Sequence, residues 1–371
     1  MYYESKNERK RDKIIIFIFM VVVIFLLCIL ILKLDSNSSS KMFTTNYETN
    51  KLSTSSEESV ENNDSKKINE IVKCVVGISK LEQNGESIFL GNSEEKLGLG
   101  SGVIVTDNGY ILTNQHVVGN KYSNCYVTLE NGITYDGVVV WSDTNIDLAI
   151  VKISAENLNY INLSDSDNIN LADEVYAIGN PIGIEFQRTV TKGIISGINR
   201  TIKIEDEENY MEDLIQTDAT INEGNSGGPL VNSNCELIGI NTVKISNAEG
   251  IGFAVPINII KPIIEKLINT GKFDEAYLGL YGYDKEVIPY LDSKLNINNG
   301  VYIATILPDG PLFNKGLIVG DIITQIDGNK INKMNDLKKY IYEKSPKDKV
   351  KLIIKRNERE FEVEVELGYK M

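Results

Sequence analysis

The chain has 371 residues, and its 38 basic and 52 acidic side chains give a formal net charge of −14 at pH 7. This acidic balance argues against nucleic acid as a partner, because phosphate binding needs clustered Lys and Arg. Beyond residue 33 the chain has three cysteines, each with apolar neighbours, and it has one histidine in all. We expect these cysteines to be small buried core residues, since a structural metal site needs closer Cys and His spacing. No metal and no organic cofactor is therefore expected.

The N-terminal segment has the composition of a membrane anchor. Residues 1–13 carry five basic side chains, and residues 14–32 are apolar without a charge or a proline. Such a stretch, at 1.5 Å rise per residue, is long enough to span a bilayer core of about 30 Å. The basic flank places residues 1–13 in the cytoplasm and the remainder outside it. The competing interpretation is a cleaved signal peptide, but the long apolar run without a small-residue cleavage pattern favours an uncleaved single-pass anchor in the cell membrane.

Residues 33–67 change character and consist mainly of Ser, Asn, Thr, Asp and Glu. Almost nothing there can be buried, so we expect a disordered linker that holds the rest of the protein away from the membrane. The remaining stretch of about 300 residues has the length of two domains.

The first domain, residues 68–270, is expected to be all-β. Short β-branched runs alternate with turn formers such as Asp107-Asn-Gly and Glu130-Asn-Gly. Frequent short strands with hairpin signals are typical of a barrel or sandwich. A helical pattern over residues 256–270 closes this domain.

His116 and Ser226 are the candidate base and nucleophile. A serine hydroxyl is a poor nucleophile at neutral pH, and a neighbouring imidazole that takes its proton is the usual remedy. A lone histidine beside apolar residues is more often a core group, and a Gly-Asn-Ser-Gly-Gly-Pro segment is often an ordinary turn. Asp147, which heads a strand, is the best candidate for the carboxylate that orients the imidazole. Asp143, four residues earlier, is not excluded by composition.

Motifs in a fixed order show that the sequence resembles the HtrA (Deg) family of trypsin-like serine proteases over residues 68–370. The motifs are Gly100-Ser-Gly-Val-Ile-Val, Gly109-Tyr-Ile-Leu-Thr-Asn-Gln-His-Val, Asp147-Leu-Ala-Ile-Val-Lys-Ile, Ala177-Ile-Gly-Asn-Pro-Ile-Gly, Thr189-Val-Thr-Lys-Gly-Ile-Ile-Ser, Gln216-Thr-Asp-Ala and Gly224-Asn-Ser-Gly-Gly-Pro-Leu. The resemblance implies a double β-barrel of the chymotrypsin type with the site in the cleft between the barrels. It assigns catalysis to His116, Asp147 rather than Asp143, and Ser226.

The resemblance also implies an oxyanion hole formed by the amides of Gly224 and Ser226. Glu223 departs from the family's more usual Pro or Ala beside this hole. The family's substrate-binding strand falls on Ile240, Asn241 and Thr242, and a second pocket wall on residues 250–254, which together imply an apolar pocket for a medium aliphatic side chain. The family's habit of trimerising through its protease domains implies a homotrimer.

The second domain, residues 275–370, resembles a PDZ domain, an α+β fold. Its pattern comprises a strand at 300–304, a turn and short helix at 308–317, a helix at 334–342 and closing strands at 350–355 and 361–367. PDZ domains bind the C-terminal residues of extended chains as an added strand. The family's carboxylate-binding loop falls on Tyr277, Leu278, Gly279 and Leu280.

These observations predict a membrane-anchored, extracytoplasmic serine endopeptidase that cleaves unfolded or damaged proteins through an acyl-enzyme. Peptide binding to the PDZ domain is expected to regulate catalysis through the charged loop at residues 200–213. One alternative is a non-catalytic PDZ peptide sensor with an inactive protease fold, supported only by Glu223. Another is a narrow regulatory protease with a single membrane-protein substrate.

Overall fold

The computed structural model describes residues 63–81, 97–180, 189–204, 210–222, 224–242, 250–291, 295, 297–357 and 359–370. All of them belong to one compact unit of the chain, Glu61–Met371. The expected anchor at residues 14–32 lies outside the described residues, as does the linker up to residue 62. Among the described helices, none has both the length and the apolar character needed to cross a membrane.

The end of the expected linker is helical, which corrects that prediction. Helix α2 (Asn63–Val72) begins five residues before the predicted start of the first domain. Its inner face packs Ile68, Ile71 and Val72 against the main core, whereas the polar residues around them face solvent. Burial of this face explains why a mainly polar segment forms a helix here.

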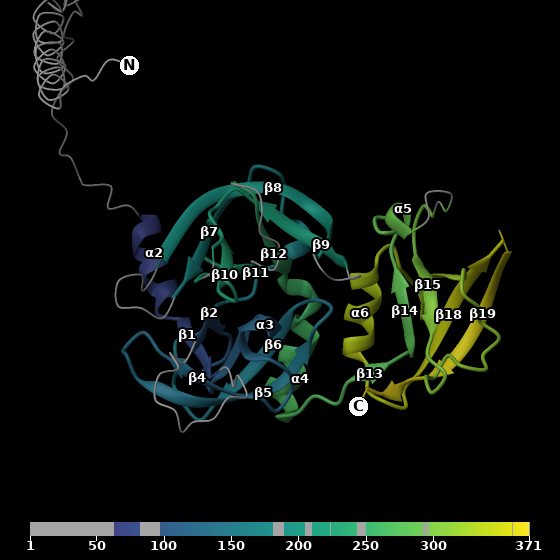
Figure 1. The fold of residues 1–371 in the computed structure, drawn as a ribbon, viewed down its shortest axis with the longest axis horizontal. Coiled ribbons are helices and arrows are strands. Elements are labelled where there is room, and N and C mark those ends of the chain that lie inside the picture. Colours follow the sequence, from purple (N-terminus) through teal and green to yellow (C-terminus); the bar gives the residue numbers. More distant parts are fainter. Residues whose placement is uncertain are drawn as a thin grey trace, which may run out of the picture. The chain divides into compact units, whose positions relative to one another are not determined.

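Two closed antiparallel barrels form the first domain, as the motifs predict (Figure 1). The first barrel has the strand order β1-β2-β3-β6-β5-β4 and the second the order β10-β11-β12-β9-β8-β7. Closure leaves neither sheet with an open edge. The first barrel consists of β1 (Val75–Leu81), β2 (Leu97–Ile104), β3 (Tyr110–Thr113), β4 (Asn124–Thr128), β5 (Thr134–Asp143) and β6 (Leu148–Ile153). The second consists of β7 (Glu174–Gly179), β8 (Thr189–Lys203), β9 (Tyr210–Thr217), β10 (Pro229–Asn232), β11 (Leu237–Thr242) and β12 (Gly252–Pro256).

Each barrel has its own interior, and a further core joins the two. Ile111 and Val151 lie inside the first barrel, and Ala177 and Leu230 inside the second. The side chains on the opposite faces of the same strands form the joint core, because successive residues of a strand point to opposite sides. The joint core holds the two barrels in a fixed arrangement, which also fixes the relative positions of the residues that lie between them.

The short elements around the barrels are mostly helical turns. They are α3 (Gln115–Val118), η1 (Ser166–Asn168), η2 (Ile257–Ile259) and α4 (Lys261–Thr270). Helix α4 confirms the helical pattern expected at the end of the first domain. It ends at Gly271, whose positive φ of 71° is a left-handed conformation that glycine adopts without strain.

The C-terminal domain has a six-stranded antiparallel sheet in which five strands follow the order β14-β15-β16-β18-β19 and β17 pairs with β16. Its strands are β13 (Ala276–Tyr277), β14 (Leu280–Tyr283), β15 (Val301–Ile306), β16 (Ile322–Ile326), β17 (Asn329–Lys330), β18 (Lys349–Arg356), β19 (Arg359–Glu366) and β20 (Gly368–Tyr369), and its helices are α5 (Ile288–Leu291) and α6 (Met334–Glu343). The short helix expected at 308–317 is wrong, because this segment forms successive turns. Asn314 and Gly316 have positive φ angles of 65° and 76° there, which a right-handed helix does not accept.

The C-terminal domain is joined to the first barrel through Asp143 at the end of β5. The Tyr342 hydroxyl of α6 donates to the Asp143 carboxylate at 3.0 Å, and the Lys370 ammonium lies 3.4 Å from it. The Tyr342 ring packs edge-on against Trp141 and Phe273, with centroids 6.0 and 6.1 Å away. Burial alone raises the pKa of Asp143, but the charges of Lys338 and Lys370 outweigh it and hold that pKa well below its usual value.

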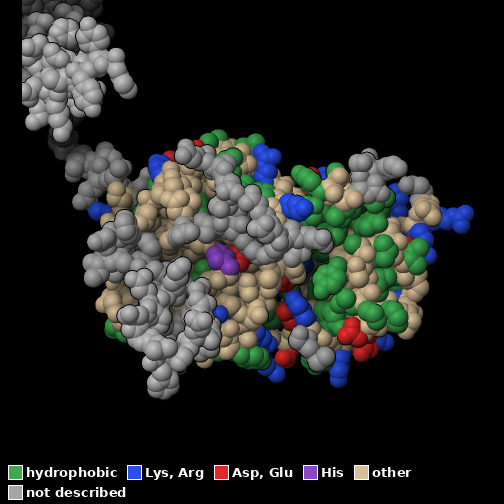
Figure 2. Space-filling model, in the orientation of Figure 1, with side chains coloured by type: hydrophobic (Ala, Val, Ile, Leu, Met, Phe, Trp, Pro, Cys, Tyr) green, Lys and Arg blue, Asp and Glu red, His purple; other side chains and the backbone are tan. Residues whose placement is uncertain are grey.

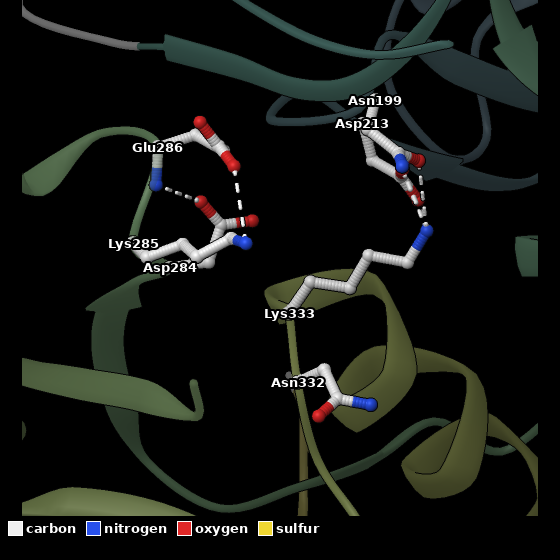
Figure 3. Close-up of a pocket in the computed structure, with 7 residues that line it drawn as sticks. All are labelled: Asn199, Asp213, Asp284, Lys285, Glu286, Asn332 and Lys333. Atoms are coloured by element: carbon white, nitrogen blue, oxygen red, sulfur yellow. Dashed lines mark hydrogen bonds and ion pairs between the residues drawn. The ribbon is translucent and has the colours of Figure 1, made fainter. Parts of the chain in front are cut away.

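A second junction joins the start of α6 to the second barrel. Asp213 of β9 accepts hydrogen bonds from Lys333 at 2.7 Å and from Asn335 at 3.1 Å. Figure 3 shows Lys333 reaching across to Asp213 and Asn199, with Asp284 and Glu286 on the other side of the hollow. The neighbouring Glu212 accepts the Asp284 amide at 3.4 Å. Burial, helped by the charge of Asp284, raises the pKa of Glu212 to about 8.

Glu212→Gln should alter how the stability of the protein depends on pH. A carboxyl whose pKa is raised on folding favours the folded state below its unfolded value near 4.5, and that contribution is lost as the pH rises to about 8. The wild type should therefore lose stability relative to the variant over this window, by about 1 kcal/mol or more. Thermal unfolding at pH 5 and pH 8.5 measures the difference. The control is Glu286→Gln, which neutralises a half-exposed acid in the same hollow; equal pH dependence of the two variants would contradict the assignment.

Candidate active site

His116 lies on a single helical turn that Asp147 fixes in place. The amide of Gln115 donates to the Asp147 carbonyl at 3.2 Å, and the amide of His116 donates to Asp147 Oδ1 at 3.0 Å. Asp147 therefore supplies the acceptors that the start of α3 needs. The imidazole is about one-third exposed, at 33%, and Figure 2 shows this side chain, in purple, at the molecular surface.

Asp147 also holds the imidazole ring. Its Oδ2 lies 2.8 Å from His116 Nδ1 and accepts the Thr242 hydroxyl at 3.0 Å, and the residue is fully buried. Its φ of 53° is a left-handed backbone conformation immediately before β6. A carboxylate at Nδ1 places the imidazole proton there and leaves Nε2 as the acceptor. The alternative candidate Asp143 contacts the C-terminal domain instead.

Ser226 lies between β9 and β10, with Oγ 2.9 Å from His116 Nε2. Strand β2 of the first barrel holds this segment of the second. The Ser101 amide donates to the Ser226 carbonyl at 2.8 Å, and the Ser101 hydroxyl donates to the Gly224 carbonyl at 2.6 Å. A side chain at Gly228 would collide with the Ile178 carbonyl, so the close approach to β7 requires glycine.

One of the two expected oxyanion-hole donors, the Gly224 amide, is not free to bind an oxyanion. The Gly224 amide donates to the Asn222 carbonyl at 2.9 Å, and so it is engaged within its own turn. An oxyanion-hole donor must instead point toward the developing negative charge. Glu223, which the sequence singles out beside this hole, lies outside the described residues.

The predicted substrate-binding residues Ile240, Asn241 and Thr242 have buried side chains, with 0%, 0% and 1% exposure. The Asn241 carbonyl accepts the Gly227 amide at 2.9 Å, so β11 supports the segment that carries Ser226. Thr242 binds Asp147 rather than lining an open pocket. The sequence held no signal for this contact, because its partners are 95 residues apart.

The predicted carboxylate-binding loop lies where the chain passes from β13 to β14. Gly279 has a φ of 79°, and a side chain there would collide with Gly310. Its carbonyl accepts the Leu307 amide at 2.9 Å. Tyr277 ends β13, Leu278 precedes the glycine, and Leu280 begins β14.

The fold and the site define a trypsin-like serine protease joined to a PDZ domain. Residues 100–240 match the trypsin-like peptidase domain family, and residues 237–367 match the PDZ domain family. The serine protease Do-like HtrA of Bacillus subtilis is 37% identical over 83% of this chain and 74% of its own length. The chain therefore belongs to the HtrA/Deg family of serine endopeptidases.

Further relatives and solved structures agree with this membership. The periplasmic pH-dependent serine endoprotease DegQ of Escherichia coli is 38% identical over 73% of this chain, which spans 59% of DegQ. The HtrA-type protease AlgW, solved with a tripeptide, has a TM-score of 0.61 at 32% identity and covers 83% of this chain and 97% of its own. The serine endoprotease of Yersinia pestis has a TM-score of 0.55 at 32% identity, with 83% and 98% covered.

Thr242→Val should weaken catalysis while leaving the fold intact. The variant keeps the shape of the side chain but removes one donor from the buried Asp147 carboxylate, and we expect kcat/KM to fall about tenfold. Steady-state cleavage of a peptide substrate measures the change. Thr217→Val is the matched control, because its fully buried hydroxyl donates to the Ile194 carbonyl at 2.8 Å, away from His116. A loss of similar size in both variants would argue against a specific role of Thr242.

Proposed function

We propose that this protein is a membrane-anchored, extracytoplasmic endopeptidase that cleaves unfolded or damaged proteins. The observation that carries the catalytic part is the line of contacts from Asp147 to His116 Nδ1 at 2.8 Å and from His116 Nε2 to Ser226 Oγ at 2.9 Å. His116 takes the hydroxyl proton as Ser226 attacks the peptide carbonyl, and it then gives that proton to the leaving amine. Water releases the acyl group in a second step that uses the same base.

Stabilisation of the tetrahedral intermediate is assigned to the amides of Gly224 and Ser226. The Gly224 amide must leave the Asn222 carbonyl before it can donate to the oxyanion. Each such donor contributes about 3 kcal/mol to the transition state, so a protein with this amide engaged is a weak catalyst until the turn rearranges. This arrangement supports regulation of the enzyme rather than constant activity.

The regulatory input is assigned to peptide binding at the PDZ domain. An extended C-terminus would add as a strand beside β14, with its carboxylate at the loop of Tyr277 to Leu280. Tyr281 on β14 is 54% exposed, and Figure 2 shows hydrophobic side chains gathered over this domain. The junctions at Asp143 and Asp213 supply a physical connection between this domain and both barrels.

The location rests on sequence and on relatives. The basic and apolar segments at residues 1–32 support a single-pass anchor with a cytoplasmic N-terminus. Relatives named as periplasmic endoproteases support an extracytoplasmic protease domain.

A homotrimer is proposed from family resemblance, and nucleic acid is not a proposed partner. The intact contacts around Ser226 favour an enzyme over a non-catalytic peptide sensor, whereas a regulatory protease with one substrate shares every feature described.

The deciding experiment is cleavage of unfolded casein by the full-length protein and by Ser226→Ala, with and without hydrophobic C-terminal peptides. We expect the wild type to cleave and the peptides to raise its rate, because they release the resting arrangement. The variant, which lacks the nucleophile, should lose at least 1000-fold in rate, the order of magnitude expected for a triad member. Equal inactivity of both proteins with intact peptide binding would favour the sensor alternative.

A further inference from the structure

Asn114 occupies a position in the site that the triad does not explain. It is the N-cap residue of α3, where asparagine normally accepts a hydrogen bond from an amide of the first turn. Its side chain makes no such bond, because Asp147 already accepts the amides of Gln115 and His116. The fully buried Asn114 side chain points instead toward Ser226.

The Asn114 amide group has one defined orientation. Its Nδ2 donates to the Asp147 carbonyl at 2.9 Å, and its Oδ1 lies 3.0 Å from Ser226 Oγ. The flipped amide would place Oδ1 against the Asp147 carbonyl, where two acceptors repel each other. Asn114 therefore presents an acceptor to the nucleophile.

The Ser226 hydroxyl lies between two acceptors but has only one proton. When His116 is neutral, that proton goes to Nε2, which is the arrangement required for attack. When His116 is protonated, Nε2–H donates to Ser226 Oγ, and the hydroxyl proton needs another acceptor. Asn114 Oδ1 is the acceptor at hydrogen-bonding distance in that state.

We propose that Asn114 holds the unreactive state of the site: its amide oxygen accepts the Ser226 hydroxyl while His116 is protonated and thereby favours that state. The role rests on the proposed function, because it requires Ser226 to be the nucleophile and His116 the base. When His116 loses its proton, the Ser226 hydroxyl turns to Nε2 and Asn114 loses its donor; on substrate attack the hydroxyl proton then passes to Nε2. Asn114 thus shifts to higher pH the point at which the site becomes reactive.

The charged surroundings of the imidazole are simple enough for a pH measurement to be interpreted. Asp147 is the only charged side chain that the described residues bring within hydrogen-bonding distance of the ring. Lys80 of β1 lies at the far end of α3, beside Gly119. The Asn114 side chain contacts the backbone carbonyl of Asp147 and not its carboxylate. A substitution at position 114 therefore leaves the charges of Asp147 and Lys80 in place.

The test is the rate at which a fluorophosphonate probe labels Ser226, measured from pH 4.5 to 9 on the full-length protein. Removing the acceptor in Asn114→Ala should move the acid limb of the profile to lower pH by about half a unit, which is the value of one hydrogen bond. The plateau at high pH should change less than about threefold, since the neutral imidazole alone accepts the proton there. Asn114→Leu, which fills the same volume without an acceptor, should give the same shift and covers the case in which the alanine variant does not fold.

Thr113→Val is the matched control. Thr113 is adjacent and equally buried, and its hydroxyl donates to the Ser101 carbonyl at 2.7 Å. This variant should leave the acid limb in place. An unchanged limb in both Asn114 variants, whatever the plateau, overturns the proposal while leaving the protease assignment intact. Absence of labelling in the wild type, equal to that of Ser226→Ala even when the stimulating C-terminal peptides are present, overturns the protease assignment and this role together.

Discussion

The buried carboxylate of Asp147 is the interaction on which the site depends. An ionised carboxylate is costly in a protein interior unless hydrogen bonds surround it. Here the donors are the ring and amide of His116 and the hydroxyl of Thr242. Because these donors come from both barrels, satisfying one charge fixes the base, the start of α3 and the end of β11 relative to each other. The carbonyl of the same residue orients Asn114, so one aspartate positions most of the polar groups around Ser226.

The nucleophile segment shows how two barrels make one site. Ser226 belongs to the second barrel, yet Ser101 of the first barrel binds its carbonyl and that of Gly224. The glycines at 227 and 228 allow the chain to approach β2 and β7 closely enough for these bonds to form. The carbonyl side of Gly224 is thus fixed from outside, whereas its amide is held only within its own turn. The proposed rearrangement of the turn would therefore involve the amide side, which is the side assigned to the oxyanion.

Buried carboxylates also hold the junctions between the PDZ domain and the barrels. Asp143 and Asp213 are both buried carboxylates whose partners come from α6 and the C-terminus. Asp143 lies at the end of β5, four residues before Asp147, so the PDZ domain contacts the strand that leads into the turn with Asp147. An aspartate that composition left open as a triad member is instead an attachment point. Asp147 and Asp143 share one physical requirement, because a buried carboxylate needs hydrogen-bond donors around it.

Local patterns of the sequence determined an all-β first domain and the candidates His116, Asp147 and Ser226, because strand periodicity, turn residues and glycine requirements are local properties of the chain. The double barrel, the PDZ domain and the choice of Asp147 over Asp143 came from the ordered motifs that the sequence shares with the HtrA family. Local patterns did not determine the helical start at residues 63–67 or the turns at 308–317, where tertiary burial and left-handed backbone angles decide. Only the tertiary structure showed that Thr242 holds Asp147, that Asn114 faces Ser226, and that the Gly224 amide is engaged. These contacts join residues far apart in the chain, and their partners are selected by how the closed barrels pack, which no local pattern encodes.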